Sequence, residues 1–171
     1  MKNRRYYIKK TVFLSLCTAV ALLLSYVEAI IPPIYAAVPG IKIGLANIAV
    51  LFILFRFGLC EAFAVSLVRI TISSLLFGNA ATFLYSFSGA VLSILLMTLL
   101  KRLDFLTVVG VSIAGGIAHN LGQVLLAMVV LNTAEVGYFM IILAVSGALA
   151  GFCVGLCGGI AVKRIKLDGG E

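Results

Sequence analysis

Charged residues are scarce in this sequence, and acidic residues are scarcer still. Only 11% of the 171 residues are charged, with 6 Asp and Glu against 13 Lys and Arg, whereas 63% are hydrophobic. A soluble domain averages about 25% charged residues, and no soluble fold of this length could bury so much apolar surface. The composition therefore excludes a soluble domain and favours a protein that exposes apolar side chains to lipid.

The motifs of several enzyme classes are also absent. There is no Gly-rich phosphate loop ending in Lys-Ser/Thr, so the chain does not hydrolyse ATP alone, and there is no G-x-S-x-G elbow. A prenyl diphosphate synthase needs aspartate clusters that hold Mg²⁺ on diphosphate, but Asp104 and Asp168 are far apart. We therefore expect no catalytic residues in this chain.

Metal ligands are equally few. His119 is the single histidine, and Cys153 and Cys157 lie four residues apart in an apolar helical run rather than in a ligand loop. Such cysteines are typical of small apolar packing residues. We expect no metal and no cofactor.

What the sequence does contain is a series of continuous apolar runs. The mean hydropathy is +1.23, and in lipid the default structure for such runs is the helix, because every backbone group must be paired. We predict an all-α membrane protein, with residues 1–171 forming one integral membrane domain. The first run is predicted to be a retained helix rather than a cleaved signal peptide. The six expected transmembrane helices cover residues 11–31, 43–57, 61–77, 82–100, 105–131 and 136–162.

Basic residues predict the orientation of these helices. Clusters at both ends of the chain, together with Arg56, Lys101 and Arg102, fall on one side of the membrane, and only Lys42 falls on the other. By the positive-inside rule both termini are cytoplasmic, in a multi-pass protein of the plasma membrane. Basic flanks that contact lipid headgroups account for the net charge of +7, so we expect no nucleic-acid partner.

Small residues recur every four positions in the first and last spans. Such stripes let helix backbones approach closely, either inside the bundle or against a second membrane protein, and both alternatives remain open. The stripes are Thr11, Ser15 and Ala19; Ala21, Ser25 and Ala29; and Gly147, Gly151, Gly155 and Gly159.

Arg69 stands near the middle of the third span. Its guanidinium keeps its proton and is costly in hydrocarbon, so it is a candidate functional residue. It either pairs with Glu28 or Glu61 or binds an anionic or polar substrate, and these alternatives can coexist.

The densest polar group is His119, Asn120 and Gln123 in the fifth span. His119 and Gln123 are four residues apart and share a helix face. The group forms either a hydrogen-bonding wall for a ligand or a set of bonds between helices.

A polar, turn-forming stretch, residues 39–47, separates the first two spans and contains Lys42 and Asn47. We predict that it covers an outward-facing pocket, with Lys42 facing the ligand or paired with Glu28. The predicted substrate-binding residues are Glu28, Lys42, Asn47, Arg69, His119, Asn120 and Gln123.

Several segments carry a family resemblance. PGIKIGLAN at 39–47, SLLFG at 74–78, YSFSG at 85–89 and AHNLGQ at 118–123, with Glu28 before Pro32-Pro33, resemble the Gx transporter family, also labelled heptaprenyl diphosphate synthase component I. That family is similar to the S components of energy-coupling factor (ECF) transporters.

The resemblance implies an S-component-like bundle that binds a small molecule from outside the cell. It also implies as partners a coupling transmembrane protein with ATPase subunits. The synthase label implies an alternative, a non-catalytic membrane subunit beside a prenyl synthase catalytic subunit in prenyl diphosphate or quinone biosynthesis.

Overall fold

The computed structural model describes residues 2–30, 44–103 and 105–165, and within these ranges the chain is helical and has no strand. This confirms the all-α prediction. The helices, in chain order, are α1 (Lys2–Ile30), α2 (Asn47–Arg56), α3 (Leu59–Phe77), α4 (Ala80–Leu100), α5 (Val108–Leu131), the short 3-10 helix η1 (Glu135–Phe139) and α6 (Met140–Arg164).

Five of these helices are long and apolar enough to cross a membrane, namely α1, α3, α4, α5 and η1–α6. The exception is α2, which has 10 residues and is therefore about 15 Å long, half of the hydrocarbon thickness. The second predicted span, 43–57, is thus a short helix that starts at Asn47. The first predicted span also differs, because α1 begins nine residues earlier than expected.

Capping residues mark the ends of two long helices. The side chain of Asn79 accepts a hydrogen bond from the Thr82 amide at 2.9 Å and begins α4, and Thr107 accepts one from the Gly110 amide at 3.2 Å and begins α5. Asn132 adopts the left-handed conformation (φ 48°) that closes α5. These caps lie close to the predicted boundaries.

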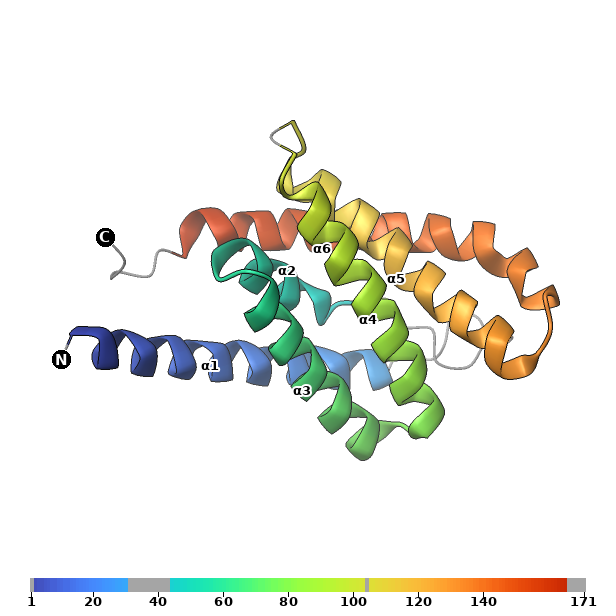
Figure 1. Cartoon of the computed structure of the whole chain (residues 1–171), viewed down its shortest axis with the longest axis horizontal. Coiled ribbons are helices and arrows are strands. Elements are labelled where there is room, and N and C mark those ends of the chain that lie inside the picture. Colours follow the sequence, from blue (N-terminus) through green and yellow to red (C-terminus); the bar gives the residue numbers. More distant parts are fainter. Residues whose placement is uncertain (1, 31–43, 104, 166–171) are drawn as a thin grey trace.

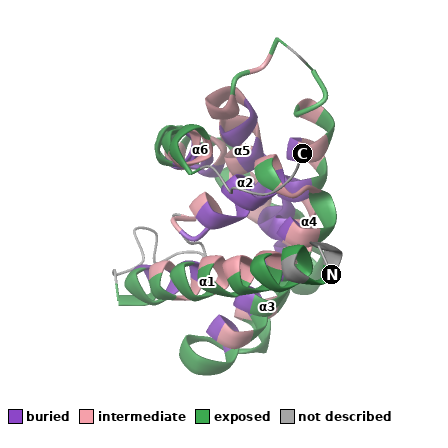
Figure 2. Cartoon of the chain, turned by 90° about the vertical axis from the view of Figure 1, so that its left-hand side faces the viewer, coloured by how far each residue is buried: buried purple, intermediate pink, exposed green. Residues whose placement is uncertain are grey.

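The helices surround α2 (Figure 1). Helix α5 packs along α4 and α6, α3 packs against α1 and α4, and α2 contacts α1, α3 and α6. All residues from Ala49 to Leu54 are buried, and they form the hydrophobic core with neighbours such as Ile94 and Val111. Figure 2 shows the contrast between buried α2 and α1, most of whose surface is exposed.

Helices α5 and α6 make the closest helix contact. A Cβ placed on Gly116 would lie 2.2 Å from the Gly147 carbonyl oxygen, and one on Gly151 would lie 2.5 Å from the Ser112 carbonyl oxygen. The glycine stripe of the last span therefore packs against a neighbouring helix of the same chain. Of its four glycines only Gly159 has no atom closer than 3.9 Å to such a Cβ.

The two stripes of α1 differ in exposure. Ala21 and Ser25 are buried, whereas Thr11, Ser15 and Ala19 are exposed. The second stripe thus contributes to packing within the bundle, and the first faces outward.

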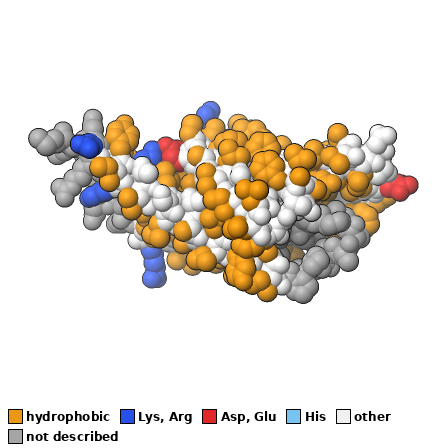
Figure 3. Space-filling model, turned by 90° about the horizontal axis from the view of Figure 1, so that it is seen from below, with side chains coloured by type: hydrophobic (Ala, Val, Ile, Leu, Met, Phe, Trp, Pro, Cys, Tyr) orange, Lys and Arg blue, Asp and Glu red, His pale blue; other side chains and the backbone are white. Residues whose placement is uncertain are grey.

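Helix α1 begins and α6 ends at one end of the bundle (Figure 1), which we call the terminal end; the opposite end, where α1, α3 and α5 finish, is the far end. On the face that Figure 3 shows, the Lys and Arg side chains lie toward the terminal end, whereas acidic side chains appear toward both ends. The basic residues with described side chains, other than Arg69, are Arg4, Lys9, Lys10, Arg56, Lys101, Arg102, Lys163 and Arg164.

Two lysine side chains at the terminal end bond to a neighbouring helix. Lys10 of α1 forms an ion pair with Glu61 of α3 at 2.5 Å. Lys101 donates to the carbonyl oxygens of Leu54 and Phe55 at 2.8 and 3.3 Å, at the C-terminal end of α2, where a cation is favourable. Partial burial lowers the pKa of Lys101.

Candidate binding site

Arg69 projects from α3 into the protein interior, with 6% of its surface exposed. Its Nη1 donates to Ser25 Oγ of α1 at 3.2 Å, whereas its Nε has no hydrogen-bond partner among the described residues. Glu28, one turn beyond Ser25, is close enough for a coulombic interaction with the guanidinium. The alternative pairing with Glu61 is wrong, because Glu61 binds Lys10.

Glu28 connects α1 to the residues that precede α2. Its Oε1 accepts hydrogen bonds from the backbone amides of Gly44 and Leu45, the latter at 2.6 Å. Gly44 has φ +87°, a conformation that glycine adopts without strain, and its carbonyl accepts from the Asn47 amide at 2.9 Å. Glu28 therefore binds backbone at the start of α2. Lys42, the other predicted partner of Glu28, lies outside the described residues.

His119 and Gln123 lie together on the buried face of α5. Their Nε2 atoms are 3.2 Å apart, and the residues are 6% and 4% exposed. Gln123 Oε1 has no hydrogen-bond partner among the described residues, whereas the His119 ring faces the backbone of Gly89 on α4, which is within its hydrogen-bonding reach. The shared face predicted from the spacing is confirmed.

The histidine ring lies between two other parts of the interior. A Cβ on Gly89 of α4 would lie 3.0 Å from the ring, so the glycine leaves the space that the ring occupies. The Gly89 backbone is also the hydrogen-bonding neighbour of the ring, and the guanidinium of Arg69 on α3 makes a coulombic contribution there.

Asn120 has a different role from its neighbour. Its Nδ2 donates to the Leu143 carbonyl oxygen at 2.7 Å and to Ser146 Oγ at 3.3 Å, both on α6. For Asn120 the structure therefore favours hydrogen bonds between helices over a contact with a ligand.

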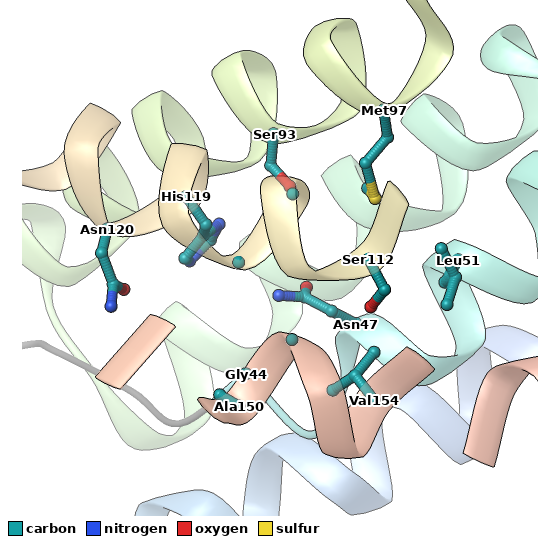
Figure 4. Close-up of a pocket in the computed structure, with 13 residues that line it drawn as sticks. Gly44, Asn47, Leu51, Ser93, Met97, Ser112, His119, Asn120, Ala150 and Val154 are labelled. Atoms are coloured by element: carbon teal, nitrogen blue, oxygen red, sulfur yellow. The ribbon is translucent and has the colours of Figure 1, made fainter. Parts of the chain in front are cut away.

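A narrow cavity lies between α2, α4, α5 and α6, with about 370 Å³ of empty space including its open side. Figure 4 shows Asn47 reaching from the start of α2 toward α5, while Asn120 points toward α6. The polar residues that line the cavity are Asn47, Ser93, Ser112, His119 and Asn120. The cavity thus brings together three of the seven predicted residues; Arg69, Gln123 and Glu28 lie outside its lining.

Buried serines are the functional candidates that the sequence prediction missed. Ser66 and Ser74 of α3 have hydroxyl oxygens without a partner among the described residues, and Ser93 and Ser112 line the cavity. Serine is common in membrane helices, where it bonds its own backbone or a neighbouring helix. The available signal was spacing, since Ser66 lies three residues before Arg69 and therefore shares its face.

The described residues contain no group of three or more His, Cys, Asp and Glu side chains that could hold a metal ion. Cys60, Cys153 and Cys157 are exposed on the apolar surface. Among the described residues, the buried polar side chains carry hydroxyl, amide, imidazole and guanidinium groups and the carboxylate of Glu28, a set that suits a small polar molecule.

Fold and site together define a helical membrane protein with a polar interior. Its apolar helices could cross a membrane several times, and polar groups of α3 and α5 remain unpaired inside it. Within this class the chain belongs to the heptaprenyl diphosphate synthase component I family, which it matches over residues 17–160. The family expected from the sequence motifs is thus confirmed. No curated protein and no solved structure matches the chain significantly.

Proposed function

We propose that this chain is the substrate-binding membrane subunit of a small-molecule importer, similar to the S components of ECF transporters. The subunit binds a polar or anionic molecule, and a coupling membrane protein with ATPase subunits drives its transport. The proposed binding residues are Arg69, His119 and Gln123, with Asn47 in the adjoining cavity and Glu28 on α1. Lys42, which lies outside the described residues, is proposed to bind the ligand with them. Asn120 also lines the cavity, but its amide nitrogen is bonded to α6, so we assign it to the contact between helices.

The observation that carries this proposal is the set of unpaired buried polar atoms. Arg69 Nε and Gln123 Oε1, together with the hydroxyl oxygens of Ser66 and Ser74, are buried without a partner among the described residues. Leaving such an atom unpaired costs about 1–3 kcal/mol, so several in one interior favour a partner that binds from outside the chain. The guanidinium of Arg69, which has the buried carboxylate of Glu28 nearby, can still donate to a polar or anionic group.

The distribution of charge supports the orientation. Basic side chains lie toward the terminal end, as expected for an end that faces the cytoplasm of a plasma-membrane protein. The far end then faces outward, and Ser25, Glu28 and Arg69 lie toward it. The exposed face of Thr11, Ser15 and Ala19 on α1 suits close contact with a helix of the coupling protein.

Mass spectrometry of small molecules that co-purify with the chain in lipid nanodiscs tests the proposal. We expect the wild type to retain a polar molecule that Arg69→Met loses. Arg102→Met is the matched control, because it removes an exposed guanidinium at the terminal end and is expected to retain the molecule. Equal retention by wild type and Arg69→Met would show that the site is assigned wrongly.

The family description favours a second candidate function, that of a non-catalytic membrane subunit in prenyl diphosphate or quinone biosynthesis. The chain has only two aspartates, so a separate catalytic subunit would bind the diphosphate and its Mg²⁺. Co-purification with a soluble prenyl synthase, together with changed prenyl chain lengths after deletion, would favour this function over import.

A further inference from the structure

The cavity between α2, α4, α5 and α6 has a lining without Asp, Glu, Lys or Arg among the described residues. Its empty space of about 370 Å³, open side included, is at the lower end of the range of about 300–1,000 Å³ for small-molecule sites. A charge that enters such a site without a counter-charge is costly. The cavity therefore suits a small molecule, or part of one, that carries no charge.

Three side chains of the lining offer hydrogen-bonding groups to a ligand. Ser93 and Ser112 are 4% and 3% exposed, and neither hydroxyl bonds to a described residue; the Asn47 carboxamide does not either. His119 and Asn120, by contrast, already contact other groups of the chain. Because a hydroxyl and a carboxamide each donate and accept, a neutral hydroxyl or carboxamide of the ligand is their matching partner.

The lining changes from polar to apolar toward the terminal end of the bundle. Helices α2, α4 and α6 all run in that direction (Figure 1). On α2 Asn47 precedes Leu51 by four residues, and on α4 Ser93 precedes Met97 by four, which is about one helical turn. Figure 4 shows Val154 of α6 at the same end of the cavity as Leu51 and Met97. The cavity thus has a polar end nearer the far end of the bundle and an apolar end nearer the terminal end.

Contacts between helices close the apolar end. A Cβ on Gly158 of α6 would lie 2.8 Å from Leu51 Cδ2, and one on Gly115 of α5 would lie 2.5 Å from Met97 Sδ. Leu51 and Met97 are both buried, and Ser112 of α5 also lies at this end (Figure 4). An apolar group of a ligand that reaches this end is removed from water, which favours binding.

Resting on the proposed function, we infer that the ligand is an uncharged amphipathic molecule. Its hydrogen-bonding head, a hydroxyl or carboxamide, binds Asn47 and Ser93, and its apolar ring or chain rests on Leu51, Met97 and Val154. Of the polar and anionic molecules that the proposed function allows, the cavity selects the uncharged ones.

Three probes separate the features of this ligand class. Benzamide combines a neutral carboxamide with an apolar ring, benzoate has the same shape with a negative charge, and acetamide has the carboxamide without the ring. Each probe is titrated against the full chain in nanodiscs by ligand-observed NMR, with empty nanodiscs as the baseline. We expect benzamide to bind at least about tenfold more tightly than either other probe, because the cavity offers benzoate no counter-charge and acetamide fills no apolar space.

Two variants test the position of the ligand. Ser93→Ala removes the proposed hydrogen bond to the head and should weaken benzamide binding about two- to tenfold. Ser86→Ala is the matched control, because Ser86 is also a buried serine of α4 but does not line the cavity, and it should bind as the wild type does. Val154→Thr places a hydroxyl at the apolar end, so it should weaken the binding of benzamide and not that of acetamide. Melting temperatures confirm that each variant is folded.

The outcomes separate the inference from the proposed function. Benzoate or acetamide binding as tightly as benzamide overturns the inference, as does equal benzamide binding by Ser93→Ala and Ser86→Ala or an unchanged preference in Val154→Thr. If no probe binds but the wild type still co-purifies with a small molecule, the inference fails and the proposed function stands. If nothing binds and nothing co-purifies, both fail.

Discussion

Helices α5 and α6 meet through glycines, whereas α3 turns serines and an arginine toward the same interior. In the first region backbones touch, as at Gly116 and Gly147, and Asn120 has its amide nitrogen bonded twice to α6. In the second region Ser66, Ser74 and Arg69 each have a polar atom without a partner among the described residues.

The difference indicates two roles within one bundle. A contact made of backbone and a paired amide has little freedom to rearrange. Unpaired buried groups lower the stability of the empty protein and become favourable when something binds them. The glycine contact between α5 and α6 is thus a scaffold, and we expect the ligand contacts to come from α3 and from His119 and Gln123 of α5.

The largest expected effect comes from filling the glycine contact. Gly151→Ala places a methyl group 2.5 Å from a carbonyl oxygen of α5, and overpacking of this kind costs about 1–3 kcal/mol. Thermal unfolding in detergent should show a clear loss of stability. Gly159→Ala, two positions further along the same stripe, where a Cβ would make only ordinary contacts of 3.9 Å with Val108, is the control and should be nearly neutral. Equal melting temperatures for the two variants would contradict the scaffold role.

A smaller effect is expected from Asn120→Ala. This change removes the two hydrogen bonds to α6, and hydrogen bonds between membrane helices contribute about 0.6 kcal/mol on average and up to about 1.7. The unfolding free energy should fall by this amount, while binding of a co-purified molecule stays largely intact. Loss of binding without loss of stability would assign Asn120 to the ligand site instead.

Arg69→Met should affect stability less than Asn120→Ala, although it acts on binding far more. Within the described part of the chain, the guanidinium makes a single hydrogen bond, to Ser25, and its Nε has no partner. Its replacement by an apolar side chain should change the free energy of unfolding of the ligand-free protein by no more than about 1 kcal/mol in either direction. A large loss of stability with no effect on ligand retention would instead make Arg69 a structural cross-link.

The smallest effect is expected at the terminal end. Lys10 and Glu61 are each about one quarter exposed, and exposed ion pairs contribute about 0.2–1 kcal/mol. Lys10→Met should lower the melting temperature slightly and leave binding unchanged. The residual difference from wild type should shrink further in high salt, which screens the pair. A salt-independent loss of several degrees would show that α1 depends on this contact more than the account allows.

Much of this architecture could be predicted from the sequence because its signals are local. Apolar runs give four of the long helices within a few residues of their observed bounds, and the glycine stripe gives a close helix contact. Polar residues inside apolar spans are expected to face the protein interior, and this expectation holds for Arg69, His119 and Gln123.

The partners of those residues could not be predicted, because they depend on how distant helices meet. Glu61 binds Lys10 rather than Arg69, and Asn120 bonds α6 although it neighbours His119 in sequence. The length of α2 was also predicted wrongly. The apolar run that contains α2 already begins before the turn at Gly44, where φ is +87°, so the run is longer than the helix. Only the folded chain shows that this run divides into a turn and a short buried helix.

The most direct test of the account is an experimental structure of the chain purified in lipid nanodiscs. The account predicts density for a small molecule in contact with Arg69 Nε and with at least one of His119 Nδ1 and Gln123 Oε1. An interior in which these three atoms are paired with other groups of the chain, and no molecule lies between α3 and α5, would contradict it.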